Sequence, residues 1–258
     1  MALTSFSQRM IGLFSTATLL FVFGLSAMAT AEELIVEASE SLEWKQDEGV
    51  YIATGNASAV QGNRSISGDV LTARYNPDED AQSISQIIAR GNVAFADAAH
   101  NGSGQMLDYD QTAQRYILTG PQAQLDGPDG TARADDIIFE RSQNHITLTG
   151  NAFVSLTDGR KLAGQDLKIF LDDAQNVSQI IAEGQVKVVQ PSGQTATSDR
   201  ADYNRAENTA LFVGNVVIID ADSKLTGERA EIDFATGVSR MLSGTGSRVS
   251  GRFTINQN

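Results

Sequence analysis

Three aspartate pairs have residue types and spacings that could support acid–base chemistry: Asp78–Asp80, Asp135–Asp136 and Asp172–Asp173. A glycosidase uses two carboxyl groups, one as acid and one as base or nucleophile. The first and third pairs lie in turn-like sequence, where aspartate is common because its side chain bonds to nearby backbone. The second pair opens a predicted strand. We therefore interpret the pairs as solvated structural residues and predict no catalytic site.

Other residue types that often carry chemistry also favour structural roles. His100 and His145 have no ligand spacing around them, and the absence of cysteine excludes disulfides, thiol catalysis and cysteine-based zinc sites. We expect Trp44 and Tyr51 to cover an end of the core rather than to bind sugar. "GPDG" (Gly127–Gly130) is a turn and not a phosphate loop, because no helix follows it. The sequence predicts no enzyme, no metal site and no cofactor.

The charge of the chain excludes one class of partner. Its formal net charge is −13, whereas proteins that bind nucleic acid hold the phosphate backbone with clustered Lys and Arg. The same charge argues against electrostatic attraction to an anionic membrane. Hydrophobic residues make up 41% of the chain, which is enough to form a core.

The first residues resemble an export signal. Arg9 supplies a positive end, an uncharged apolar run follows at Ile11–Leu25, and Ala27–Ala29 and Ala29–Ala31 fit the small-x-small cleavage pattern. We predict that residues 1–31 are a cleaved signal peptide. The alternative is an uncleaved membrane anchor, but the apolar run is short for a full span.

Glycines recur along the chain at an interval of about thirty residues, and such self-similarity indicates a repeat architecture. Each of these glycines lies in a strand-like run. The recurring positions are Gly55, Gly91, Gly120, Gly150, Gly184, Gly214 and Gly244.

Two types of strand alternate within each repeat. In "IIAEGQVKVV" (Ile180–Val189), small or apolar residues occupy every second position, the pattern of a half-buried strand. A second type, such as "GDVLTARY" (Gly68–Tyr75), again has one apolar face, and polar turns join the two types. About six two-strand repeats and no convincing amphipathic helix predict an all-β protein. Periodicity alone leaves a sandwich, a jelly roll and a β-helix open.

The glycines in the middle of the strands have two interpretations. They can permit a sharp bend or bulge, or they can leave unfilled space between two sheet faces. The residues alone slightly favour the bend. A glycine in a strand also lets another backbone or a ligand approach closely, and this role is compatible with either interpretation.

The order of the motifs resembles the OstA-like family of periplasmic lipopolysaccharide-transport proteins. The matching stretches include "LTARYNPDEDAQSISQIIARGNVAF" (Leu71–Phe95), "AEGQVKV" (Ala182–Val188) and "AENTALFVGNVVI" (Ala206–Ile218). This resemblance implies an open, twisted β-jelly roll of two antiparallel sheets over residues 32–244, with residues 245–258 as a C-terminal edge strand or flexible tail. The chain is longer than a typical single-domain member by one or two repeats.

The resemblance also implies a function in the periplasm. Family members bind the acyl chains of lipopolysaccharide between their sheets and stack head to tail with themselves and with related folds on inner- and outer-membrane partners. We expect the N-terminal edge at "ELIVEASE" (Glu33–Glu40) and the C-terminal edge near "GERAEIDF" (Gly227–Phe234) or "RFTINQ" (Arg252–Gln257). The alternatives are the membrane-anchored inner-membrane partner of the same system and a β-helical structural or carbohydrate-active protein.

The alternating apolar faces supply the candidate residues of a lipid-binding groove. Each of them can instead be plain core, and we expect roughly half of the set to contact lipid because the inward face serves both purposes. The candidates are Val93, Phe95, Leu107, Leu118, Ile137, Phe139, Leu148, Val154, Leu167, Ile169, Val186, Val188, Phe212 and Val216.

Overall fold

The computed structural model describes residues 33–77, 83–221, 223–244 and 248–253. The predicted signal peptide (residues 1–31) and the Asp78–Asp80 pair lie outside these described residues. Two short 3-10 helices, η1 (Gln46–Glu48) and η2 (Arg141–Gln143), accompany the strands. The strands are β1 (Leu34–Glu37), β2 (Ser41–Lys45), β3 (Val50–Gln61), β4 (Arg64–Tyr75), β5 (Ile84–Ala96), β6 (Asn101–Asp110), β7 (Arg115–Gly127), β8 (Gly130–Glu140), β9 (His145–Leu156), β10 (Lys161–Leu171), β11 (Val177–Val189), β12 (Thr195–Asn204), β13 (Thr209–Asp220), β14 (Ser223–Asp233), β15 (Val238–Leu242) and β16 (Ser250–Phe253).

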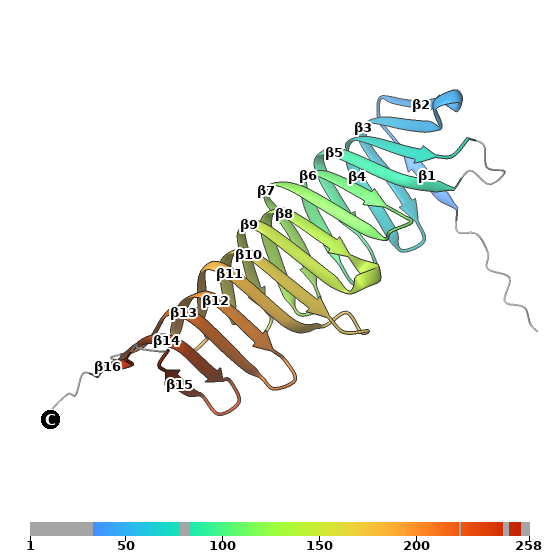
Figure 1. The fold of residues 1–258 in the computed structure, drawn as a ribbon. Coiled ribbons are helices and arrows are strands. Elements are labelled where there is room, and N and C mark those ends of the chain that lie inside the picture. The colour runs from blue at the N-terminus through green and yellow to red at the C-terminus, as the bar shows by residue number, and fades with distance from the viewer. Residues whose placement is uncertain (1–32, 78–82, 222, 245–247, 254–258) are drawn as a thin grey trace, which may run out of the picture. The chain divides into compact units, whose positions relative to one another are not determined.

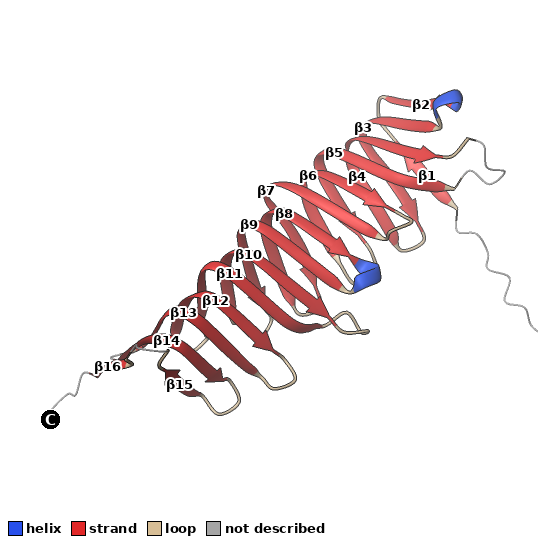
Figure 2. Cartoon of the chain, in the orientation of Figure 1, coloured by secondary structure: helices blue, strands red, loops and turns tan. Residues whose placement is uncertain are grey.

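The strands pair with their neighbours in chain order, from β3 through to β15 (Figure 1). Long strands form successive hairpins from β3–β4 to β13–β14, and strand is the dominant structure throughout (Figure 2). The prediction of an all-β protein built from about six two-strand repeats is confirmed. Every ladder among the described residues is antiparallel. The β-helix alternative is therefore wrong, because its rungs pair in parallel.

The recurring glycine marks a bulge in the middle of the strand. In β9, Gly150 and Asn151 both have positive φ, 77° and 50°, and in β13 Gly214 and Asn215 have φ of 80° and 49°. The ladder changes register at these points, between Val213 and Val216 for example. Two consecutive residues in the left-handed region turn the chain sharply, and glycine and asparagine adopt that region at the lowest cost. The interpretation of the glycines as bends is confirmed.

At several of these bulges, the asparagine side chain donates a hydrogen bond to an aspartate on the preceding strand. Asn151 Nδ2 donates to Asp135 Oδ2 at 2.9 Å. A Cβ added at Gly150 would lie 2.6 Å from the same carboxylate oxygen, so the glycine makes room for Asp135 rather than for the interior. Asn215 and Asp199 repeat this bond at 2.9 Å. Asp135 was expected to open a strand, but it lies inside β8 because the strand already begins at Gly130.

The bulges fold the single sheet into two facing layers. Each long strand contributes one half to each layer. Layer 1 contains β2, β15, the first halves of the odd-numbered strands β3 to β13 and the second halves of the even-numbered strands β4 to β14. Layer 2 contains β1, β16, the second halves of the same odd-numbered strands and the first halves of the same even-numbered strands. Ring contacts join the layers: Phe95 of layer 2 stacks on Tyr116 of layer 1, with centroids 5.0 Å apart. The predicted open jelly roll of two antiparallel sheets is confirmed, with the two sheets continuous through the bulges.

Different strands form the edges at the two ends of the layers. At the N-terminal end the edges are β1 in layer 2 and β2 in layer 1, and the predicted edge at Glu33–Glu40 contains β1. At the C-terminal end the edges are β15 and β16, which both pair with β14. The alternative edge at Gly227–Phe234 is wrong, because β14 has neighbours on both sides. β15 was not predicted from the sequence, and Gly244 follows that strand rather than lying within one.

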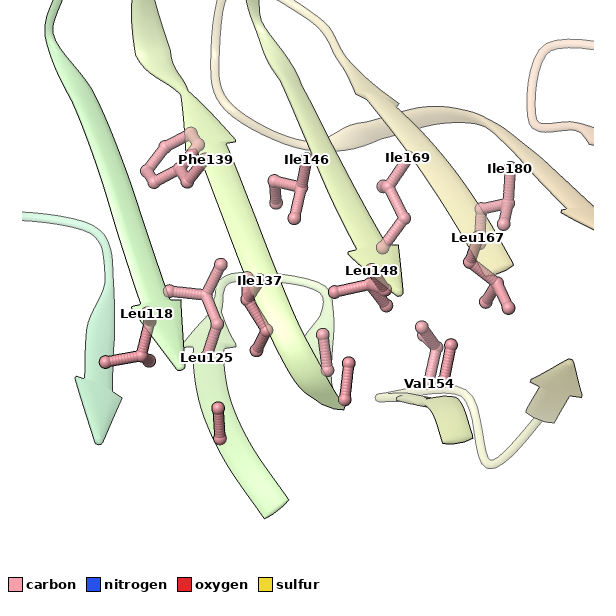
Figure 3. Packing of buried hydrophobic residues seen from close by; sticks show 14 of the residues in the cluster. Leu118, Leu125, Ile137, Phe139, Ile146, Leu148, Val154, Leu167, Ile169 and Ile180 are labelled. Carbon is pink, nitrogen blue, oxygen red and sulfur yellow. The ribbon is translucent and has the colours of Figure 1, made fainter. Parts of the chain in front are cut away.

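One hydrophobic cluster fills the space between the layers. Inward positions on either side of each bulge contribute to it, such as Leu148 and Val154 of β9, which are 0% and 3% exposed. Figure 3 shows labelled members of the cluster on neighbouring strands. The bend at each bulge thus sets two apolar faces against one another, because both halves of a strand keep their apolar side inward.

Candidate functional site

An opening into the interior lies between the N-terminal edges β1 and β2. This cavity of about 460 Å³, which we name the N-terminal mouth, is lined by Leu34, Val36, Leu42, Glu43, Trp44, Tyr51, Ile52, Ala53, Ala59, Leu71, Ala73, Ile84 and Ile87. Its volume falls in the range of small-molecule binding sites, about 300–1,000 Å³. At its rim, Leu42 and Trp44 of β2 are 62% and 50% exposed. Apolar side chains this exposed mark a surface suited to an apolar ligand.

Aromatic rings form one wall of the mouth. Trp44 stacks on Tyr51 with centroids 5.7 Å apart, and Tyr51 lies 5.1 Å from the ring of Tyr75. Trp44 Nε1 donates to the hydroxyl of Tyr75 at 2.7 Å, which satisfies the indole N–H. Trp44 and Tyr51 lie at the N-terminal end of the core, as predicted, but they border an opening there rather than cover it. The indole is fixed in place beside the cavity.

The mouth is continuous with the core. Ala53, Ala59, Leu71 and Ile87 line the cavity and also belong to the hydrophobic cluster between the layers. An apolar group that enters the mouth therefore meets the same inward faces that run along the whole protein.

The structure brings all fourteen predicted groove residues together. Each belongs to the hydrophobic cluster, and Val188 is the most exposed of them at 9%. None of the fourteen lines the N-terminal mouth. The residues that do line it were missed by the sequence reading, although "LIVE" (Leu34–Glu37) and "SLEWK" (Ser41–Lys45) carry the same alternation of apolar and polar positions.

Opposite the bulges, hairpin loops of the two layers meet along a line that we name the seam. Asp129 in the β7–β8 turn of layer 2 accepts the backbone N–H of Val177 in layer 1 at 2.6 Å. The guanidinium of Arg205 in the β12–β13 loop pairs with the same carboxylate. "GPDG" is the turn that the sequence predicts, and it also holds the seam closed at this point.

Arg160 joins the layers at a second point of the seam. Its Nη2 donates to the hydroxyl of Tyr203 at 3.0 Å, and its guanidinium carbon lies 4.6 Å from the ring centroids of both Tyr203 and Phe234. Asp158 accepts from Arg160 Nε at 2.7 Å. The cation thus lies over two aromatic faces of layer 1 while its own loop belongs to layer 2.

A third link involves a buried carboxylate. Arg141 Nη1 of η2 donates to Asp97 Oδ2 at 2.6 Å, and the Asp97 side chain is 2% exposed. Burial acts to raise the pKa of Asp97. The imidazole of His100, the backbone N–H groups of Ala99 and His100, and Arg141 outweigh it and hold the pKa well below its usual range.

Replacement of Asp97 by asparagine is expected to lower the free energy of unfolding by about 2 kcal/mol at pH 7, the loss of hydrogen bonds to a charged group. Because the folded pKa is lowered, the stability from ionised Asp97 is present above its unfolded pKa of about 3.9 and is lost as the pH falls. Urea unfolding of both proteins should therefore show a smaller difference at about pH 3 than at pH 7. A difference that stays constant between the two pH values would contradict this role.

Asp172 and His145, which were considered as catalytic or metal-binding residues, have structural partners. Asp172 Oδ1 accepts the backbone N–H groups of Ala174 and Asn176, each at 2.9 Å, as expected for a turn. His145 Nε2 lies 2.8 Å from Glu140. Within the described ranges, no group of three or more His, Cys, Asp or Glu residues could hold a metal ion. In the same ranges, no helix has the length and apolar character needed to span a membrane.

Comparisons with known proteins match one family to the N-terminal part of the chain. Residues 36–139 match the family model described as LptA/(LptD N-terminal domain) LPS transport protein. This segment includes nearly all of the N-terminal mouth and extends into β8.

The other comparisons give matches among solved structures but no curated relative. A comparison with curated proteins finds no match. Among solved structures, LptH from Pseudomonas aeruginosa is titled the LptA homologous periplasmic component of the conserved lipopolysaccharide transport device. It is 18% identical, with a TM-score of 0.40 over 46% of this chain and 83% of that chain. Over residues 36–139 the chain is therefore similar to the LptA/(LptD N-terminal domain) LPS transport proteins, in agreement with the resemblance of its motifs to the OstA-like family.

Proposed function

We propose that this protein acts in the periplasm as a lipopolysaccharide bridge, shielding acyl chains between its two layers and passing the lipid from the inner to the outer membrane. The observation that carries the proposal is the N-terminal mouth, an apolar cavity of about 460 Å³ that opens onto the interlayer core. Chains enter at the mouth, and the two packed layers separate where a chain extends further along the inward faces that carry the fourteen groove residues. The predicted export signal supports the periplasmic location.

The energetics of a lipid in water explain why such a path is needed. Each methylene hidden from water is worth about 0.8 kcal/mol, so exposing a chain of roughly a dozen methylenes costs on the order of 10 kcal/mol. A protein that moves the lipid must replace water along the chain with apolar side chains. The mouth offers Leu34, Val36 and Leu71 for this purpose on two facing layers.

The two ends of the layers suit head-to-tail stacking with another copy and with related folds on inner- and outer-membrane partners. Edge strands present unpaired backbone groups that can pair with another chain. The N-terminal edges carry Glu37, Glu43 and one basic residue, Lys45, whereas the C-terminal edges carry Arg240 and Arg252, so the two ends differ in net charge and attract when one docks on the other. Exposed apolar side chains at both ends, such as Phe253 at 63%, support the same arrangement.

Salt dependence tests how the lipid is held. Because the chain carries a net charge of −13, we expect binding through acyl chains, with the anionic head groups left in solvent. Affinity should change by less than about threefold between about 0.05 M and about 0.5 M NaCl, since apolar contacts are not screened. The fluorescence of Trp44, the one tryptophan of the chain, reports binding at the mouth. A loss of affinity of about tenfold or more would show that charge pairs hold the lipid.

A further inference from the structure

A second, polar cavity lies in the seam, far along the chain from the residues that line the N-terminal mouth. Its volume is about 330 Å³, and its lining includes Asp129, Asp158, Arg160, Tyr203, Arg205 and Asn208. These residues come from the loops that join β7–β8, β9–β10 and β12–β13, and from the end of β12. The cavity is therefore built where layer 1 and layer 2 meet.

An apolar slot adjoins this polar cavity. It has a volume of about 40 Å³ and is lined in part by Ile180, Val188 and Phe212 of the interlayer core. Leu156, Arg160 and Tyr203 line both spaces, so the two are neighbours that share a wall. A polar space beside a narrow apolar one matches a molecule with a polar head and an alkyl chain.

The polar groups of the seam cavity are held in place by one another. Arg205 Nη1 pairs with Asp129 and also donates to the carbonyl of Val177 at 3.1 Å. Arg160 is fixed by Asp158 and by the hydroxyl of Tyr203. A guanidinium has five N–H donors and a carboxylate about four acceptor positions, so these pairs leave capacity for a ligand. The cavity offers donors and acceptors together.

The charges in the cavity select among polar ligands. Arg160 and Arg205 are balanced by Asp158 and Asp129, so an anion gains no net attraction and must displace a carboxylate to reach a guanidinium. A neutral polyhydroxyl ligand can donate to the carboxylates and accept from the guanidiniums without breaking either pair. The ring of Tyr203 adds an apolar surface beside these groups. This combination favours a sugar over a phosphate.

We propose that the seam cavity binds a sugar ring of a glycolipid head group, with the start of the alkyl chain in the adjoining apolar slot. The identity of the natural glycolipid as lipopolysaccharide rests on the proposed function, but the cavity itself can be tested with simpler molecules. Binding at the seam would place a head group beside the interlayer path instead of leaving all of it in solvent.

The test is an amide NMR titration of the purified protein with octyl β-glucoside below its critical micelle concentration. Shifts are expected at residues 157–161 and 203–208. The Arg205→Ala variant should weaken binding at these residues about tenfold, the loss of hydrogen bonds to a charged donor. Arg200→Ala is the matched control, because Arg200 is a similarly exposed arginine that pairs with Glu183 away from the cavity. It should leave the affinity unchanged.

A second variant and a second ligand distinguish the possible outcomes of the titration. The Tyr203→Phe variant retains the ring but loses the hydroxyl that accepts from Arg160, and it should also weaken glucoside binding. This variant carries the test if Arg205→Ala fails to fold. Octyl phosphate, with the same chain, should bind more weakly than the glucoside. Tighter binding of the phosphate, shifts elsewhere only, or unchanged affinity in both variants would overturn the proposal. Lipopolysaccharide titrations read at Trp44 separately test the mouth, so failure at one site is distinguishable from failure at the other.

Discussion

An aspartate in place of Ala73 is expected to lower the affinity for lipopolysaccharide by at least about a hundredfold, because an unpaired carboxylate in an apolar site costs several kcal/mol to desolvate. Ala73 is partly buried, lines the N-terminal mouth and pairs with Tyr51 and Ile87 on the inward face of layer 1. An acyl chain that fills the mouth would remove water from the new charge. Titration of lipopolysaccharide against Trp44 fluorescence measures the affinity.

Thr72→Asp is the matched control for this substitution. Thr72 is the preceding residue of β4, so its side chain points to the opposite face of the sheet, and it does not line the mouth. The control should bind lipid as the unsubstituted protein does. If both variants bind alike, and both keep the thermal stability of the original, acyl chains do not enter at the mouth.

The Phe139→Ala variant is expected to lose about 3–5 kcal/mol of unfolding free energy, because a large buried ring is replaced by a cavity. Phe139 is 1% exposed, and its centroid lies 5.9 Å from that of Tyr116 and 4.8 Å from that of His100. His100 belongs to the layer 2 end of the seam, so the ring also connects the layers. Urea unfolding at neutral pH measures the change.

Ile138→Ala controls for the loss of a large side chain on the same strand. Ile138 is the neighbouring residue of β8, partly exposed on the outer face. Its truncation should cost less than about 1.5 kcal/mol, because partly exposed side chains leave no enclosed cavity. Equal losses in the two variants would contradict the assignment of Phe139 to a packed interlayer core.

The strands and their bends could be predicted because they depend on local sequence. Alternation assigned Leu148 and Val186 to the inward face, and the repeated glycine with asparagine marked the bulge, since both signals lie within one strand. The role of Asp135 was not predictable in this way. Its partner Asn151 lies on the next strand, and the register of a hairpin had to be known before the two could be matched.

The site was less predictable than the fold. Alternation distinguishes inward from outward positions, but it treats each repeat alike and cannot say where the interior is packed and where it is open. The N-terminal mouth exists because β1 and β2 lack further neighbours, which is a property of the ends rather than of any motif. The seam contacts, such as Asp97 with Arg141, join residues far apart in the chain. β15 was missed because "VSRML" is short and largely exposed.

Photocrosslinking to lipopolysaccharide tests most directly whether acyl chains lie between the layers. A crosslinking residue is placed at Leu42 or Val186, which face inward at the mouth and in the core, and at Thr72 or Lys187, which face outward and do not line the mouth. We predict that Leu42 and Val186 label the lipid and that Thr72 and Lys187 do not. Equal labelling on the two faces, or no labelling at either inward position, would contradict it.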